Sequence, residues 1–111
     1  MSLDIKESDW KIFRQVHETA LDRFCQKVLS EVTHLTADTG KSNHERYGEL
    51  YGLIKKRDKE MAHMFDRLSR SNALFQLASM RLHGLVMDDE LARFSQEVRN
   101  SVQTYAEIAR S

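Results

Sequence analysis

The sequence contains no proline among its 111 residues, only four glycines and a single cysteine. Because proline removes a backbone donor and clashes with the preceding helical turn, a chain without proline can form long uninterrupted helices. The lone cysteine, Cys25, excludes an internal disulfide and is typical of a protein from a reducing compartment. These absences favour long helices over a small disulfide-stabilised domain.

An excess of one charge sign is also absent, and so is any long hydrophobic run. Seventeen Lys and Arg balance seventeen Asp and Glu, so the formal net charge is zero. A neutral chain lacks the field that steers a protein to nucleic acid or an anionic membrane, and it tends to self-associate. No apolar run approaches the roughly 20 residues of a membrane-spanning helix, and the first residues lack the charged-then-apolar order of a secretory signal. We therefore expect a cytoplasmic protein with no membrane segment.

The sequence does show a clear helical periodicity, because apolar residues recur at intervals of three and four. This spacing places them on one side of each helix, and the chain length suits one hydrophobic core. The pattern predicts an all-α single domain, a compact antiparallel bundle of about four helices, with an irregular or frayed segment at 1–7. The expected helices are 9–36, 43–68, 71–83 and 89–109. Whether the first helix is continuous near His17 is left open.

Glycines and capping residues set the predicted helix ends. Gly40, in the loop after the first helix, is available for a positive φ angle. Ser42 and Glu45 form an S-x-x-E capping box at the start of the second helix. Gly84 is expected to end the third helix, and Asp88 to cap the fourth.

Three polar residues fall on the predicted inward faces: His17 and Glu31 in the first helix and Asp58 in the second. Buried without partners, they would be strongly destabilising. We expect His17 to pair with Asp58 and Glu31 with Tyr51 as core hydrogen bonds, with Arg81 assisting. The alternative is a small polar pocket that binds a ligand or a metal.

Two E-x-x-H sequences, Glu31 with His34 and Glu60 with His63, have the spacing found in di-iron helical bundles. Such sites also need a glutamate from each of two further helices, with every ligand facing inward. The helical projection turns Glu60 and His63 toward solvent. We therefore predict no metal site and no cofactor.

The predicted helix at 71–83 is apolar on two sides, so each of these sides needs another element or a partner to pack against it. Its second face is formed by Phe75, Ala78 and Leu82. We predict that these three residues form an interface with a protein partner or a second subunit.

A basic tract lies between positions 53 and 82, but acidic residues interrupt it and no stacking aromatics accompany it. That composition favours a solvated helix face over a phosphate-binding surface, and makes nucleic acid an unlikely partner. The basic residues are Lys55, Lys56, Arg57, Lys59, Arg67, Arg70 and Arg81.

The sequence has no phosphate-binding glycine loop, no nucleophile elbow and no zinc-spaced cysteines. We therefore predict a non-enzymatic protein–protein interaction or self-associating module, for which a homodimer is one form. One alternative is a small-ligand or metal-binding bundle that uses His17, Glu31 and Asp58. A third is weak nucleic-acid association through the basic tract of the second helix.

Overall fold

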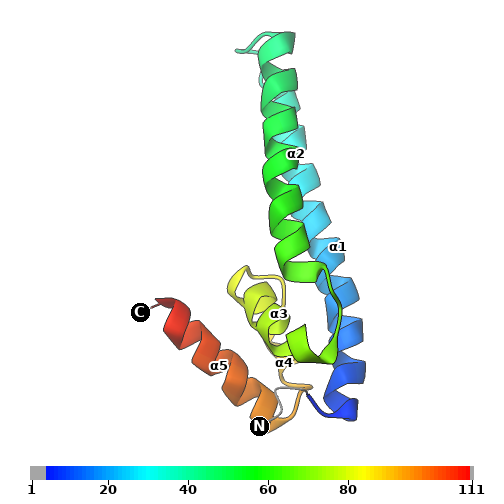
Figure 1. Cartoon of the computed structure of the whole chain (residues 1–111). Helices are drawn as coiled ribbons and strands as arrows, with labels where there is room; N and C mark the ends of the chain where they lie inside the picture. Colours follow the sequence, from blue (N-terminus) through cyan, green and yellow to red (C-terminus); the bar gives the residue numbers. More distant parts are fainter. Residues whose placement is uncertain (1–4, 111) are drawn as a thin grey trace.

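The computed structural model describes residues 5–110, and this part of the chain is all-α (Figure 1). Its helices are α1 (Glu7–Ala37), α2 (Asn43–Phe65), α3 (Arg70–Leu82), α4 (Asp88–Leu91) and α5 (Gln96–Arg110). No helix among these residues is apolar over a length that would cross a lipid bilayer. The predicted all-α bundle is confirmed.

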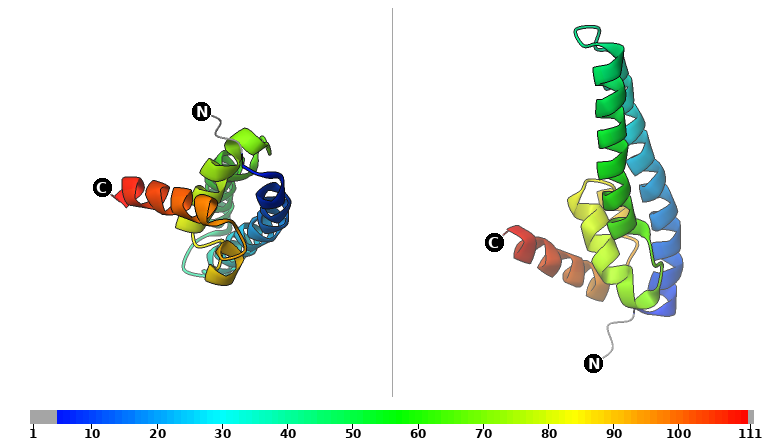
Figure 2. Two further views of the ribbon diagram at one scale, coloured as in Figure 1. Left: turned by 90° about the horizontal axis from the view of Figure 1, so that it is seen from below. Right: turned by 45° about the horizontal axis from the view of Figure 1, so that its top comes forward.

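The molecule is elongated, with principal extents of 55 × 28 × 24 Å. Helices α1 and α2 form a long antiparallel hairpin, and α3, α4 and α5 gather at one end of it, which we call the base (Figures 1 and 2). Seen from below, α5 leaves the base sideways, away from the hairpin axis (Figure 2). The buried apolar residues lie in the base, so the bundle is compact only at this end.

The first two helices differ from the prediction at their outer ends. Helix α1 is continuous past His17 and begins at Glu7, inside the segment expected to be irregular; residues 1–4 of that segment lie outside the described part. Ile5 is already buried in the core. Helix α2 ends at Phe65 rather than at position 68, because Arg67 adopts a left-handed conformation with φ 59° that no continuing helix allows.

The single helix predicted at 89–109 is wrong, because α4 and α5 are separated by a turn that ends at Ser95. The Ser95 hydroxyl accepts a hydrogen bond from the Val98 amide at 3.3 Å and so caps α5. The same serine donates from its backbone amide and its hydroxyl to Asp9, at 2.9 and 2.7 Å. Asp9 is only 2% exposed. This carboxylate therefore fixes the start of α5 against the start of α1.

The predicted glycine stop at the end of α3 is confirmed. Gly84 has φ 73°, and the amides of Gly84 and Leu85 donate to the carbonyls of Arg81 and Met80 at 3.0 and 2.9 Å. This pair of bonds is a Schellman motif. It turns the chain so that Leu85 and Val86 enter the core.

Two other predicted helix ends differ in detail. Gly84 is the only glycine of residues 5–110 with a positive φ, so Gly40 does not use the positive φ available to it; the Gly40 amide instead donates to the Asp38 side chain at 3.0 Å. Ser42 caps α2 as predicted, by accepting from the Glu45 amide at 3.1 Å, but the Glu45 carboxylate accepts from the Ser42 hydroxyl, not from the Ser42 amide as a capping box requires. Asp88 does not cap α4, since it is the first helical residue and pairs with Arg81.

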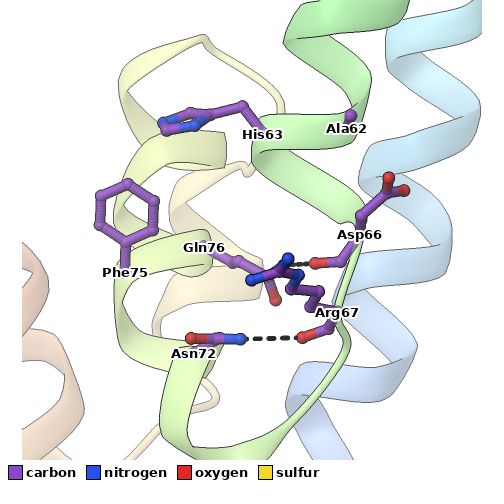
Figure 3. A pocket seen from close by; sticks show the side chains of 7 residues that line it. All are labelled: Ala62, His63, Asp66, Arg67, Asn72, Phe75 and Gln76. Atoms are coloured by element: carbon purple, nitrogen blue, oxygen red, sulfur yellow. Dashed lines mark hydrogen bonds between the residues drawn. The ribbon is translucent and has the colours of Figure 1, made fainter.

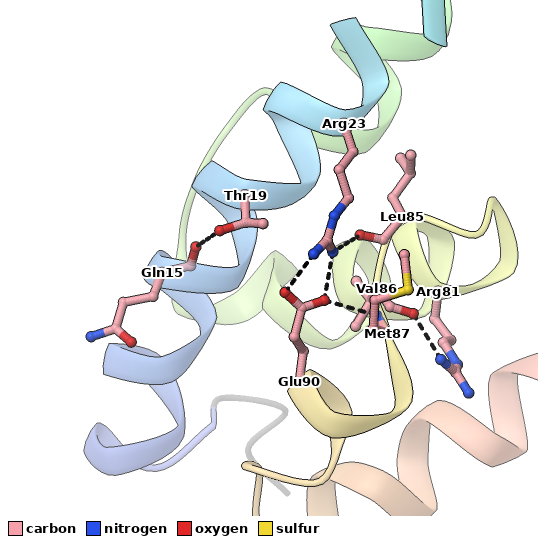
Figure 4. A network of polar contacts seen from close by, with 8 residues as sticks. All are labelled: Gln15, Thr19, Arg23, Arg81, Leu85, Val86, Met87 and Glu90. Atoms are coloured by element: carbon pink, nitrogen blue, oxygen red, sulfur yellow. Dashed lines mark hydrogen bonds and ion pairs between the residues drawn. The ribbon is translucent and has the colours of Figure 1, made fainter. Parts of the chain in front are cut away.

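A polar network ties the segment after α3 to α1 (Figure 4). Arg23 donates to both carboxylate oxygens of Glu90, at 2.5 and 2.9 Å, and to the Leu85 carbonyl at 2.9 Å. Glu90 also accepts from the Met87 amide at 2.8 Å, which helps to start α4. Hydrogen bonding from Arg23 holds the pKa of Glu90 below its ordinary value.

We predict that Asp9→Ala lowers the free energy of unfolding by about 1–3 kcal/mol, because it leaves two partly buried donors of Ser95 without their acceptor. Urea denaturation measures this loss. Ser95→Ala should cost less in the Asp9→Ala background than in the wild type, and Ser8→Ala, at an exposed neighbouring position, is the control. Additive losses for the two residues would contradict the proposed coupling.

We predict that Glu90→Gln destabilises the fold at pH 7 by roughly 1–3 kcal/mol, because the charge-assisted bonds from Arg23 are lost. A carboxyl whose pKa is lowered by folding stabilises the protein above its unfolded pKa, and this stabilisation disappears as the pH falls through the folded pKa. Wild type and variant should therefore converge below about pH 4. Urea melts across this pH range measure the convergence, with exposed Glu18→Gln as the control. A constant gap at all pH values would contradict the assignment.

Candidate functional site

The predicted pairing of His17 with Asp58 is wrong. His17 is half-buried and donates from Nε2 to the Phe65 carbonyl at 3.0 Å, while its ring meets the Phe65 ring edge-on at 5.3 Å. Asp58 is exposed on α2. His17 therefore ties α1 to the last residue of α2 by a contact with the backbone.

The predicted pairing of Glu31 with Tyr51 is also wrong, because Tyr51 is 66% exposed. Glu31 instead receives two hydrogen bonds from the Arg57 guanidinium, at 3.0 and 2.8 Å, and Arg57 also binds Glu60 at 2.9 Å. These bonds, which Arg57 donates and Glu31 accepts, lower the pKa of Glu31 and raise the pKa of Arg57. A charged cluster thus joins the two helices in the middle of the hairpin.

Both errors have one cause, which is that the predicted inward face of α2 is rotated from the observed one. The side of α2 on which Asp58 was expected to face inward also carries Tyr47, Tyr51 and Ile54, and all three are exposed. The half-buried seam against α1 instead uses a mixed set of aliphatic and charged residues. Its members are Arg46, Leu50, Leu53, Arg57, Glu60 and Met61.

The five residues predicted as a polar core or pocket do not come together. Arg81 donates to the Val86 carbonyl at 2.7 Å and forms an ion pair with Asp88, so it serves the base rather than the hairpin. The described residues contain no group of three or more His, Cys, Asp or Glu placed to hold a metal ion. His17, Glu31 and Asp58, which the alternative interpretation placed in one ligand or metal site, are therefore not brought together.

The predicted interface on α3 is partly wrong. Phe75 and Leu82 are exposed, but Ala78 is only 3% exposed and lies inside the base, so it is not available to a partner. Phe75 lies between two other rings, meeting His63 edge-on at 5.3 Å and Tyr105 at 6.5 Å. Its surface is already shared with α2 and α5.

A different apolar surface lies on the projecting half of the hairpin. Every residue from 29 to 63 is described, and every one is at least partly exposed. Tyr47, Tyr51 and Ile54 share one face of α2 by their four- and three-residue spacing. Leu29 on α1 is 65% exposed, and helical projection places it on the same side of the hairpin, turned away from α3. We call these four residues the hairpin face.

Exposed charges of both signs lie near the hairpin face. Lys27 is exposed on α1, and Lys55, Asp58 and Lys59 are exposed on α2. Much of the remaining basic tract is paired: Arg57 with Glu31 and Glu60, Arg70 with Glu7, and Arg81 with Asp88. The tract is therefore not a continuous free positive surface.

Comparison with protein-family models, curated proteins and solved structures finds no significant match for this chain.

Proposed function

We propose that this chain is a non-enzymatic self-associating module, and that the hairpin face binds a second copy of the chain. The observation that carries the proposal is the lack of any buried residue between positions 29 and 63, together with the large apolar side chains on one side of that segment. Large exposed side chains in one row are typical of interaction surfaces.

Burial of these side chains supplies the driving force. Covering a large apolar side chain contributes roughly 1.5–3 kcal/mol. The hairpin face offers two tyrosines, an isoleucine and a leucine, and aromatic residues are enriched where interfaces gain most of their energy. Two hairpins packed face to face form a four-helix bundle, which supplies the second layer that each hairpin lacks.

Charge supports a second copy as the partner. The chain has no net charge, so two copies do not repel one another at long range. In a two-fold pair packed face to face with the axis along the hairpins, α1 of one copy faces α2 of the other. Exposed charges of both signs lie near the hairpin face, so acidic groups of one copy can pair with basic groups of the other.

We predict that sedimentation equilibrium shows a dimer that dissociates on dilution, and that the double variant Tyr51→Glu with Ile54→Glu weakens it at least about tenfold. Both positions are exposed, so the monomer should keep its fold, which circular dichroism checks. Phe75→Asp on α3 is the matched control and should leave the dimer unchanged.

Two results would contradict this proposal. A chain that stays monomeric up to about 0.5 mM has no useful self-association. A dimer that Phe75→Asp dissociates and the hairpin variant does not would place the interface on α3.

A further inference from the structure

A surface pocket of about 510 Å³ lies at the corner between α2 and α3 (Figure 3). It has an apolar side, formed by Ala62 with the rings of His63 and Phe75. Its polar side is formed by Asp66, Arg67, Asn72 and Gln76. A pocket of this size has room for a small molecule of amino-acid dimensions. It lies at the base, apart from the hairpin face.

Gln76 is the unusual residue of this pocket. Its side chain is 2% exposed, and its Nε2 donates to the Asp66 carbonyl at 2.5 Å. That bond fixes the orientation of the amide, because the reverse orientation would bring two oxygens together. The Oε1 atom is then buried, and no donor of residues 5–110 bonds to it. A buried acceptor without a partner is destabilising, and a ligand N–H or O–H at this place would form the missing hydrogen bond.

Where Gln76 supplies an acceptor, Arg67 supplies positively charged hydrogen-bond donors. Its backbone has a positive φ, and its carbonyl is held by the Asn72 side chain at 3.1 Å. Residues in this strained region are concentrated at binding sites. Figure 3 shows the Arg67 side chain lying across the pocket in front of Gln76. Within residues 5–110 its guanidinium forms no ion pair, so it is free to pair with a ligand carboxylate.

The nearby start of α3 also favours an anion. Its first turn contains no acidic residue, and the Ser69 side chain does not cap it. Uncapped amides at a helix N-terminus attract negative charge. Arg67 is thus the positive group on the polar side of the pocket, and the carboxylate of Asp66, which also lines the pocket, points away from Gln76 (Figure 3).

From these contacts we infer that the corner pocket binds a carboxylate that has an N–H donor beside it and an apolar side chain. The carboxylate pairs with Arg67, whose side chain swings aside and uncovers the amide of Gln76. The N–H then donates to Gln76 Oε1, and the apolar side chain contacts Phe75 and Ala62. A free amino acid and the C-terminal residue of a peptide share this chemistry.

The test is an NMR titration of the full chain with three probes: L-phenylalanine, N-acetyl-L-phenylalanine and N-acetyl-L-phenylalaninamide. We expect one or both carboxylates to shift the side-chain amide signals of Gln76 and to raise the melting temperature. The amide probe lacks the carboxylate and should bind at least about tenfold more weakly. Tighter binding of the acetylated acid points to a peptide end, and tighter binding of L-phenylalanine to a free amino acid.

Arg67→Gly is the decisive variant, because glycine accepts the positive φ and should preserve the fold while removing the guanidinium. We expect it to reduce binding at least about tenfold. Gln76→Met removes the acceptor at similar volume and should also weaken binding, whereas the exposed Arg14→Ala is the control and should not. The inference is overturned if neither carboxylate shifts the side-chain amide signals of Gln76 at about 10 mM. It is also overturned if the Arg67→Gly variant binds the carboxylates as tightly as the wild type. Water would then be the partner of Gln76 Oε1.

Discussion

The central constraint on this structure is that α1 and α2 extend well beyond the helices that pack against them. Helices α3 and α5 reach only the base, where α1, the end of α2 and the segment around Leu85 form the core. A two-helix hairpin has no interior of its own, because each helix can be covered by its partner on one side only. The projecting half therefore exposes either apolar or charged side chains along its whole length.

The base is held by polar contacts at its edges as well as by apolar packing. Asp9 joins α1 to α5, and Arg23 joins α1 to the segment between α3 and α4. Both contacts link residues far apart in the sequence, and both organise a helix start. These contacts explain why α4 and α5 are separate helices: the turn at Ser95 lets α5 leave the base while the residue that caps it, Ser95, stays fixed to α1.

Local signals in the sequence predicted the helical class, the Ser42 cap and the Gly84 stop, since capping and a Schellman turn depend on neighbouring residues. The face of α2 that packs against α1 could not be predicted from such local signals. Tyr47, Tyr51 and Ile54 form the more apolar stripe, yet Arg57 is the residue turned to the seam, because Glu31 lies opposite it on α1. The pocket was missed for the same reason: Gln76 is an ordinary polar residue until the left-handed turn at Arg67 places a carbonyl beside it.

The stability of the projecting half of the hairpin bears on how the hairpin face can bind a second copy. Helix α2 contains Gly48 and Gly52 in its exposed half, and no side chain or backbone approaches either position. A glycine inside a helix is destabilising by roughly 1 kcal/mol relative to alanine, and here no close packing offsets that loss. The seam beside them is joined by charged groups that remain partly solvated, such as Arg57 with Glu31, and such pairs contribute little. The projecting hairpin thus has few contacts within the monomer to stabilise it, and burial against a second copy would add packing where the monomer has least of it.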